Sequence, residues 1–211
     1  MNRKIVIVDY GVGNLFSINE ACKHLGYSTI LSSNPKIILN ADNLILPGVG
    51  AFEIAIEKLK NLNLIDVIKS YVLTGKPLMG VCLGMQLLFD ESEEFGNNKG
   101  LGLIEGKILR FPDYYNESKL VIPHIGWNNI VYKNLPWQGT PLKNTLNNSL
   151  MYFVHSYYAL PTSTSNILTE STYSRFTFCS SVQKDNIYGF QFHPEKSGVE
   201  GLKLYENFFK L

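Results

Sequence analysis

The stretch PLMGVCLG, residues 77–84, joins an apolar run to a helical pattern through Cys82, which has a glycine two residues away on either side. The run 77–81 is typical of a strand buried on both faces, and 83–89 predicts the helix behind it. A cysteine here is the thiol form of a nucleophile elbow, whose strained turn needs small neighbours and projects the sulfur above the sheet edge. A small buried cysteine is the commoner alternative, but the motif favours a nucleophile at Cys82.

Outward from this turn, the first 90 residues alternate strand and helix patterns. The β-branched run 5–8 predicts a buried strand, and the apolar residues of 14–25 keep the spacing of a helix that stops at Gly26. Further patterns predict strands at 27–31 and 44–46 and helices at 51–60 and 65–73. This alternation predicts an open, mostly parallel sheet with helices on both faces.

Beyond Gly96 the pattern becomes mostly β. Strand-like segments between Pro, Gly, Asn and Ser turns are expected near 103–111, 129–132, 151–154, 176–182 and 187–192. An amphipathic helix at 199–209 is expected to pack back on the sheet. Because no repeat or low-complexity tract interrupts the chain, residues 1–211 are expected to form a single domain.

The composition excludes several classes of function. Nineteen basic and eighteen acidic residues leave a net charge of +1, which implies no field that would gather nucleic acid or anionic lipid. The three cysteines lack the close spacing of zinc sites or disulfide frameworks, and His124 and His155 have no companions at metal-ligand spacing. The apolar run after Met1 is too short for a signal peptide or a membrane span. We therefore expect a cytoplasmic protein without metal or cofactor that acts on a small or protein-borne substrate.

A cysteine nucleophile needs a base, and His193 is the best placed of the four histidines. It follows the apolar run 188–192, and strand ends are where parallel-sheet enzymes hold functional groups. Residues two apart in an extended chain share one face, so Glu195 can orient the imidazole while Pro194 keeps the backbone extended. A surface His-Pro-Glu turn is the alternative, and the presence of the cysteine turn in the same chain makes it less favoured.

Four motifs resemble those of the class I glutamine amidotransferases. The stretches 80–86 and 193–195 match that family's G-x-C-x-G-x-Q and H-P-E motifs in the same order. Together with DYGVGNL (9–15), LPGVGAF (46–52), GVCLGMQLL (80–88) and QFHPEKS (191–197), the whole chain is similar to the glutaminase subunits of imidazole glycerol phosphate synthase. The resemblance implies a flavodoxin-like α/β fold with a β-rich second half, and hydrolysis of L-glutamine to L-glutamate and ammonia.

The resemblance also implies a role for each matched position. Cys82 would form a γ-glutamyl thioester, His193 would move protons and Glu195 would hold His193 in place. The glycines of 47–50 would allow a peptide flip in an oxyanion strand, so that the implied oxyanion-binding N–H groups belong to Val49, Gly50 and Leu83. The implied glutamine-binding residues are Gly48, Gln86, Glu94, His155, Ser156 and Tyr157.

A partner follows from the same resemblance. Members of this branch pass ammonia through a tunnel to a cyclase subunit, which makes imidazole glycerol phosphate and an aminoimidazole carboxamide ribotide in histidine biosynthesis. The chain would therefore be half of a heterodimer. The residues that fall where the family meets its cyclase are Asn14, Trp127, Tyr152 and Lys196, and ordinary surface or core packing is the alternative for each.

Other interpretations stay open at this point. The stretches 113–119, 134–148 and 178–181 look closer to a paralogous branch that supplies ammonia to sugar amidotransferases of surface-polysaccharide synthesis, so the ammonia acceptor is undecided. A stand-alone cysteine hydrolase would be fully active without a partner, whereas a silent binding module would leave glutamine untouched. A dinucleotide-binding turn at 11–13 is incomplete, because Phe16 stands where that fingerprint requires glycine.

Overall fold

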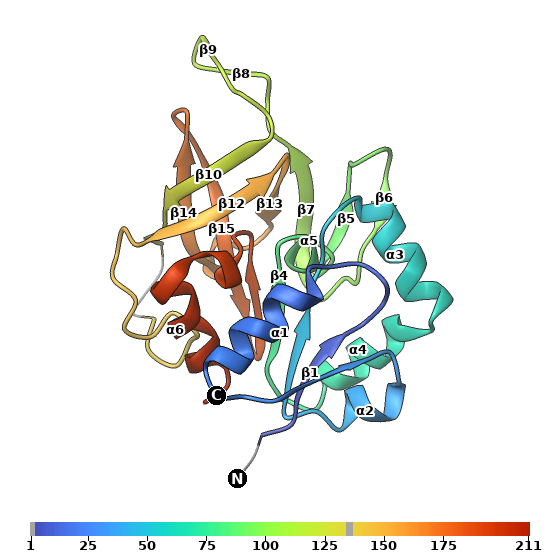
Figure 1. Cartoon of the computed structure of the whole chain (residues 1–211). Helices are drawn as coiled ribbons and strands as arrows, with labels where there is room; N and C mark the ends of the chain where they lie inside the picture. Colours follow the sequence, from blue (N-terminus) through green and yellow to red (C-terminus); the bar gives the residue numbers. More distant parts are fainter. Residues whose placement is uncertain (1–2, 134–136) are drawn as a thin grey trace.

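The structure, a computed structural model, describes residues 3–133 and 137–211 and is built around one large sheet (Figure 1). The parallel part of this sheet consists of β1 (Ile5–Val8), β2 (Thr29–Ser32), β3 (Asn43–Leu46), β4 (Leu78–Val81) and β16 (Ile187–Phe190). These strands lie in the order β2-β1-β3-β4-β16, and each is parallel to its neighbours. The predicted parallel, doubly wound half is therefore confirmed.

The second half of the chain extends the sheet beyond β16 with mostly antiparallel strands. In spatial order these are β15 (Phe176–Lys184), β13 (Tyr157–Pro161), β7 (Ile104–Arg110), β5 (Phe89–Ser92) and β6 (Asn98–Lys99). Next to β15 lies β14 (Ile167–Tyr173), and β11 (Val131–Tyr132) pairs with β14. In the described residues, two separate antiparallel pairs complete the strands: β10 (His124–Asn129) with β12 (Leu150–His155), and β8 (Tyr114–Tyr115) with β9 (Ser118–Lys119).

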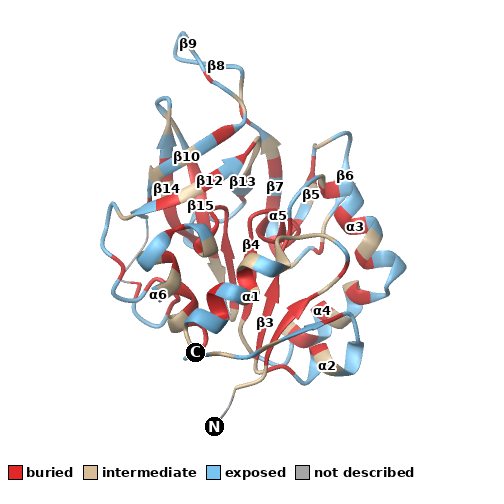
Figure 2. Ribbon diagram, viewed as in Figure 1, coloured by how far each residue is buried: buried red, intermediate tan, exposed pale blue. Residues whose placement is uncertain are grey.

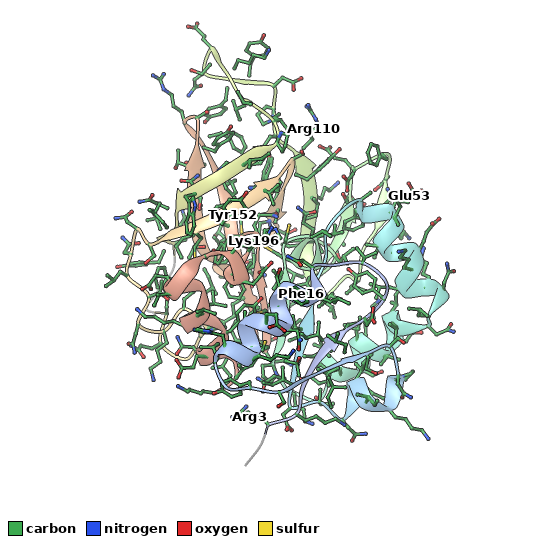
Figure 3. All side chains as sticks on the ribbon, viewed as in Figure 1. Arg3, Phe16, Glu53, Arg110, Tyr152 and Lys196 are labelled. Atoms are coloured by element: carbon green, nitrogen blue, oxygen red, sulfur yellow. The ribbon has the colours of Figure 1, made fainter. Side chains whose placement is uncertain are left out.

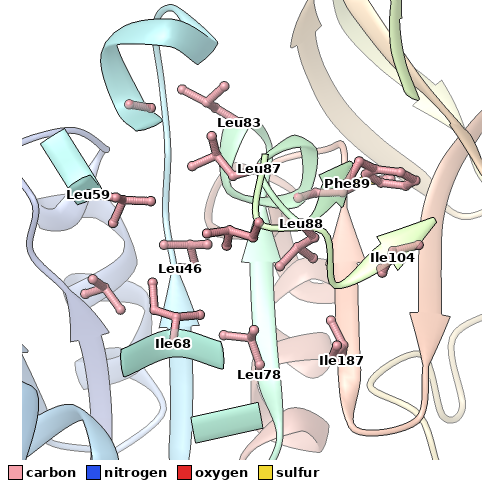
Figure 4. Packing of buried hydrophobic residues seen from close by; sticks show 14 of the residues in the cluster. Leu46, Leu59, Ile68, Leu78, Leu83, Leu87, Leu88, Phe89, Ile104 and Ile187 are labelled. Carbon is pink, nitrogen blue, oxygen red and sulfur yellow. The ribbon is translucent and has the colours of Figure 1, made fainter. Parts of the chain in front are cut away.

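Helices cover both faces of the parallel strands. The alternation of β1 explains why, since Val6 and Val8 point into one apolar cluster and Ile5 and Ile7 into another. The first cluster is closed by α2 (Pro35–Leu39), α3 (Phe52–Asn61) and α4 (Leu64–Val72), and the second by α1 (Leu15–His24) and α6 (Gly198–Phe208). Figure 2 shows the buried strands between these helices, and Figure 4 shows part of the first cluster.

The helix predicted at 83–89 is shorter than expected. It is α5 (Leu83–Gln86), because the carbonyl oxygens of Leu87 and Leu88 accept from the N–H groups of Leu101 and Leu103 instead of continuing the helix. The chain then enters β5, which runs parallel to β7. Within 3–133 and 137–211, two short 3₁₀ turns complete the elements, η1 (Thr164–Asn166) and η2 (Pro194–Lys196).

The topology gathers several sequence motifs at one edge of the sheet. The paired residues Leu46 and Gly80, and Val81 and Phe190, show that β3, β4 and β16 end level with one another. The segments that follow these three strands therefore leave the sheet side by side, and they carry the predicted catalytic and oxyanion-binding residues.

Candidate functional site

Cys82 lies on a strained turn at the carboxyl end of β4. Its φ of 53° and ψ of −113° fall where residues with side chains are seldom found. The Cys82 N–H donates to the carbonyl oxygen of Phe190 at 2.7 Å, which holds the turn against β16. A Cβ atom on Gly84 would lie 1.9 Å from the carbonyl oxygen of Leu46, and one on Gly80 would lie 2.7 Å from that of Gly84. The flanking glycines therefore allow α5 to pack closely enough to form the turn.

His193 and Glu195 are joined by a buried hydrogen bond. Nδ1 of His193 lies 2.8 Å from Oε1 of Glu195, and both side chains are almost fully buried. The hydroxyl of Tyr205 on α6 approaches the other Glu195 oxygen at 3.5 Å. Nε2 of His193 is also buried and has no hydrogen-bond partner among the described residues, so it is the nitrogen left for the Cys82 thiol.

The surroundings of His193 favour its protonated form. Burial by itself would lower the pKa of His193, but its interaction with the nearby Cys82 and the hydrogen bond and charge of Glu195 outweigh burial and raise the pKa to about 10. At neutral pH the ring is therefore an imidazolium, flanked by one carboxylate. The cation lies beside Cys82, and the thiolate is the form of cysteine that attacks a carbonyl carbon.

Backbone and hydroxyl contacts fix the segment that carries His193. The His193 N–H donates to the carbonyl oxygen of Tyr152 at 2.9 Å, so η2 is tied to β12. The Ser197 hydroxyl donates to the His193 carbonyl oxygen at 2.6 Å and accepts from the Tyr152 N–H at 3.0 Å. Three residues thus close one network that sets the position of the imidazole.

A cavity of about 300 Å³ opens in front of Cys82 and His193. It is large enough for an amino acid, and its walls come from the segments after β3 and β4, from β12 and β13, and from 93–96. The lining residues are Val49, Gly50, Cys82, Leu83, Gln86, Glu94, Pro123, Val154, His155, Ser156, Tyr157 and His193.

Gln86 lines the cavity, and its side chain contacts the fully buried Gln191. Nε2 of Gln86 donates to the carbonyl oxygen of Tyr157 at 3.1 Å and to Oε1 of Gln191 at 2.9 Å. Nε2 of Gln191 in turn lies 3.8 Å from Sγ of Cys82. Because both contacts of the Gln86 amide use its nitrogen, its oxygen is the end left to accept a hydrogen bond from a ligand.

His155 belongs to a chain of neutral hydrogen bonds that leads away from the cavity. Its Nδ1 lies 2.8 Å from the Tyr157 carbonyl oxygen, which only accepts, so Nδ1 carries the hydrogen. Nε2 of His155 therefore accepts from Nδ1 of His124 at 3.0 Å, and Nε2 of His124 is left to accept from the Asn128 amide at 3.4 Å. Burial lowers the pKa of His155 to about 3 and that of His124 to about 4, in agreement with neutral rings.

The segment 47–50 packs against the start of α5. A Cβ atom on Gly48 would lie 2.7 Å from the backbone nitrogen of Gly84, so Gly48 lies behind the cavity wall that Val49 and Gly50 form. The buried Tyr10 hydroxyl donates to the carbonyl oxygen of Pro47 at 2.7 Å and anchors the start of the segment.

Glu94 lies at the opposite wall of the cavity. Its Oε2 accepts from the Phe52 N–H at the first turn of α3 at 2.7 Å. Burial raises the pKa of Glu94, and the hydrogen bond from Phe52 partly offsets this effect. The second carboxylate oxygen is left for a donor in the cavity.

Three of the four predicted interface residues form one exposed group. The rings of Trp127 on β10 and Tyr152 on β12 lie edge to face with centroids 6.0 Å apart, and Nζ of Lys196 lies 5.8 Å from the Tyr152 ring centroid. Figure 3 shows Tyr152 and Lys196 next to each other above α6. The fourth, Asn14, caps α1, where its side chain accepts from the Ser17 N–H at 3.4 Å.

The structure brings most of the predicted residues together and adds some that the sequence did not single out. Gln191 lies inside the motif 191–197, but the sequence assigns no function to it. The fold places its side chain next to Cys82. Pro123, His124 and Val154 line or support the cavity through the β10–β12 pair, whose register no local pattern predicts.

Among the residues that the structure describes, no cluster of three or more His, Cys, Asp or Glu side chains is placed to hold a metal ion. All three cysteines are free and buried. Within the same described ranges, none of the helices is long and apolar enough to cross a membrane.

Several curated proteins are similar to this chain over nearly their whole length. The imidazole glycerol phosphate synthase subunit HisH of Sulfurimonas denitrificans is 45% identical over 207 residues, which cover 98% of this chain and 97% of that protein. The subunit HisH 1 of Legionella pneumophila (strain Lens) is 43% identical over 210 residues, with coverages of 98% and 99%. The HisH subunit of Aquifex aeolicus is 43% identical over 206 residues, with coverages of 97% and 95%.

Solved structures with low sequence identity share the fold. A crystal structure of a glutamine amidotransferase superposes with a TM-score of 0.73 at 18% identity, covering 97% of each chain. The glutaminase domain of Trypanosoma brucei CTPS with bound acivicin gives a TM-score of 0.65 at 16% identity, covering 99% of this chain and 94% of that one. The family model described as glutamine amidotransferase class-I matches residues 6–211. The chain therefore belongs to the class I glutamine amidotransferases.

Proposed function

We propose that this chain is the glutaminase subunit of an imidazole glycerol phosphate synthase, formed as one domain over residues 1–211. The observation that carries the chemistry is that Cys82 and His193 line one cavity of amino-acid size, while Glu195 is hydrogen-bonded to His193. The specific pathway is supported by the HisH relatives, which match nearly the full chain at 43% to 45% identity.

In the first half of the reaction, the Cys82 thiolate attacks the side-chain carbonyl carbon of L-glutamine. The carbonyl oxygen takes up the negative charge, and N–H groups of Leu83 and of the segment containing Val49 and Gly50 hold it. The intermediate collapses as the carbon–nitrogen bond breaks and His193 donates its Nε2 proton to the leaving nitrogen, which departs as ammonia. A γ-glutamyl thioester remains on Cys82.

In the second half, water replaces ammonia. His193, now neutral, takes a proton from the water as the oxygen attacks the thioester carbon. The carbon–sulfur bond then breaks, which gives L-glutamate and restores the thiolate beside an imidazolium. Glu195 supports both halves by keeping a hydrogen on Nδ1, so that Nε2 is the nitrogen that gains and loses the proton.

The cavity offers acceptors and donors for the amino-acid end of glutamine. The free oxygens of Glu94 and Gln86 suit the α-ammonium group, since both accept hydrogen bonds. The stretch His155, Ser156 and Tyr157 lines the cavity and suits the α-carboxylate, and the backbone of Gly48 supports the wall that the substrate meets. No cofactor enters this scheme.

The partner in this proposal is a cyclase subunit that forms a cytoplasmic heterodimer with the chain and receives ammonia directly. Trp127, Tyr152 and Lys196 present an aromatic group with one positive charge beside the cavity, and aromatic residues of this kind often anchor protein interfaces. Asn14 at the start of α1 would extend the same face. A sugar amidotransferase is the alternative acceptor of ammonia, and the test includes it as a separate arm.

The test measures glutamate release by the isolated chain and with each partner and its acceptor. We expect slow release alone and strong stimulation by the cyclase subunit, with stimulated release lost in Cys82→Ala. The Cys82→Ala complex should still form product when ammonia is supplied, because the acceptor site is on the partner. Cys22→Ala, which removes another buried thiol, is the matched control and should retain stimulated release.

Each other outcome rejects part of the proposal. Stimulated turnover in Cys82→Ala would exclude the thioester route. Stimulation by the sugar amidotransferase and not by the cyclase would reassign the pathway. Full activity without either partner would indicate a stand-alone hydrolase, and no glutamate release under any condition would indicate a silent binding module.

A further inference from the structure

Gln191 is a fully buried polar residue that the proposed reaction does not use. It follows β16, and its N–H donates to the carbonyl oxygen of Ser180 at 3.0 Å, which fixes its backbone. Because β16 runs parallel to β4 in register, Gln191 comes beside Cys82 at the same edge of the sheet. Its side chain lies behind the cysteine and contacts both Cys82 and Gln86.

The hydrogen-bond network determines which end of the Gln191 amide meets the sulfur. The carbonyl oxygen of Tyr157 can only accept, so the Gln86 atom 3.1 Å away is the amide nitrogen. That same nitrogen lies 2.9 Å from the Gln191 side chain, which must therefore present its oxygen. The other end of the Gln191 amide, 3.8 Å from Sγ of Cys82, is consequently the N–H donor.

The sulfur therefore has a defined polar environment. On one side the thiol points at the carbonyl oxygen of Val154, 3.9 Å away, which accepts from a thiol but repels a thiolate. The Gln191 N–H has the opposite preference, since it donates more strongly to an anion. His193 supplies the positive charge, and Gln191 supplies a neutral donor whose orientation two other residues fix.

We propose that Gln191 is a positioning residue that stabilises and aims the Cys82 thiolate through its side-chain N–H. The inference rests on the proposed function for its catalytic meaning, since the thiolate is the attacking group in the first half of the reaction and the leaving group in the second. The hydrogen bonds on which it is based do not require glutamine to be bound. The hydrogen bonds that run from Tyr157 through Gln86 to Gln191 hold the donor in place before any substrate enters.

The experiment follows alkylation of Cys82 by iodoacetamide as a function of pH, with the modified cysteine identified by peptide mass spectrometry. In Gln191→Met, which keeps the length of the side chain without its polar atoms, the midpoint of the alkylation profile should rise by about one pH unit, the size expected for a hydrogen bond to a charged group. On the acid side of both midpoints the rate should fall about tenfold. In Gln191→Glu, which still accepts from Gln86 but turns a carboxylate oxygen toward the sulfur, the midpoint should rise further.

A purely structural role would give a different result. Thr169→Val, which removes buried hydrogen bonds to Ser180 and Ser181 in the same sheet, is the matched control. It should lower the thermal midpoint of unfolding and leave the alkylation midpoint in place. If Gln191→Met does not fold, Gln191→Glu decides, because its shape matches the native residue. Gln86→Met frees the Gln191 amide to rotate, so it should raise the alkylation midpoint by a smaller amount.

An alkylation midpoint that stays in place in the folded Gln191 variants overturns the inference. The assay contains neither glutamine nor partner, so this outcome would leave the proposed function intact. Conversely, a wild-type chain that releases no glutamate with any partner, but shows the expected rise in Gln191→Met, would reject the proposed function and keep the role of Gln191.

Discussion

At the scale of single residues, His193 and His155 line the same cavity, but their surroundings favour opposite protonation states. Cys82 and Glu195 hold a proton on His193, whereas burial, with positive charge nearby, lowers the pKa of His155 to about 3. His155 carries its hydrogen on Nδ1, where Tyr157 accepts it, and accepts on Nε2 from His124, so protein partners already engage both ring nitrogens. Proton transfer in the cavity therefore belongs to His193, and His155 acts as a fixed part of the wall.

Replacement of Glu195 tests how much of this state depends on the carboxylate. Glu195→Gln removes the charge but keeps the shape, so the pKa of His193 should fall and its imidazolium should become less populated at neutral pH. We expect glutaminase activity to drop by about 10- to 1000-fold while some turnover remains, and the alkaline limb of the pH–rate profile to move to lower pH. Steady-state kinetics from pH 6 to 10 measures both effects.

The control for this variant is Glu57→Gln on the exposed side of α3, which should follow the wild-type profile. Equal activity and an unchanged alkaline limb in Glu195→Gln would remove Glu195 from the proposed machinery.

Residues that act within one motif could be found from the sequence, and residues that meet only through the fold could not. Cys82, His193 and Glu195 each stand in a short pattern with a physical reason for its spacing, and the structure brings them together. His124 and His155 are 31 positions apart and meet only because β10 and β12 pair in one particular register. The roles assigned to all of these residues stay predictions until the variants are measured.

At the scale of elements, the β10–β12 pair joins a polar interior to an exposed aromatic surface. Alternate residues of a strand point to opposite sides, so β10 directs His124 inward and Trp127 outward, while β12 directs His155 inward and Tyr152 toward Trp127. Movement of this ribbon would therefore affect the cavity wall and the outer face together.

The buried histidine pair should make the fold sensitive to acid. In the folded chain both rings stay neutral far below the ordinary histidine value of about 6.5, because burial lowers the pKa of each, and His193 adds positive charge nearby. The unfolded chain binds protons on the same residues below about pH 6.5, so the free energy of unfolding should fall as the pH drops from about 6.5 toward 4.

Urea unfolding at several pH values measures this effect. In His124→Gln one of the two groups no longer titrates, so the loss of stability between pH 6.5 and 4 should be smaller than in the wild type. Tyr173→Phe is the matched control, because it alters the ring stacked on His124 without removing a histidine. An equally steep loss in His124→Gln would show that the acid sensitivity arises elsewhere.

The elements that periodicity could predict are those with one clear buried face. Helices α1, α3 and α4 and the parallel strands lie within a few residues of their expected positions. The helix after Cys82 was predicted too long, because the apolar residues 87–89 fit a helix as well as the turn and strand that they form. Strands β13 and β14 and helix α2 were not predicted, since their pairing partners are distant in sequence or their patterns are too short.

At the scale of the whole molecule, the cavity and the aromatic group lie at the edge of the sheet where the parallel strands end. Leu73, 87% exposed, lies at the opposite edge, because α4 ends there just before β4 begins. The proposed partner should therefore cover one edge and leave the other free.

Truncation of Trp127 tests this arrangement. Trp127 is 55% exposed and its ring packs only partly on Tyr152, so much of its surface is free for a partner. Trp127→Ala should weaken the affinity for the cyclase subunit at least tenfold, as expected for an aromatic anchor at an interface. Titration calorimetry measures the change, and Leu73→Ala should bind like the wild type. Unchanged affinity in Trp127→Ala would exclude the β10–β12 face as the centre of the interface.

The overall architecture followed from the sequence because strand and helix patterns alternate and because the resemblance covers the whole chain. The order of the strands in the second half did not, since β15, β13 and β7 are arranged by contacts between distant segments. The cavity depends on this arrangement of distant segments, because residues of β12 and β13 form part of its lining.

The chain contains two tryptophans in very different surroundings, so its intrinsic fluorescence can report the binding of a partner. Trp137 is 7% exposed and its Nε1–H donates to the carbonyl oxygen of Leu168, so its fluorescence should not respond to events at the surface. Trp127, by contrast, is exposed on the β10–β12 pair. A shift of the emission maximum to shorter wavelength on mixing with a partner would thus originate from one indole, and it would follow docking in real time without any added dye.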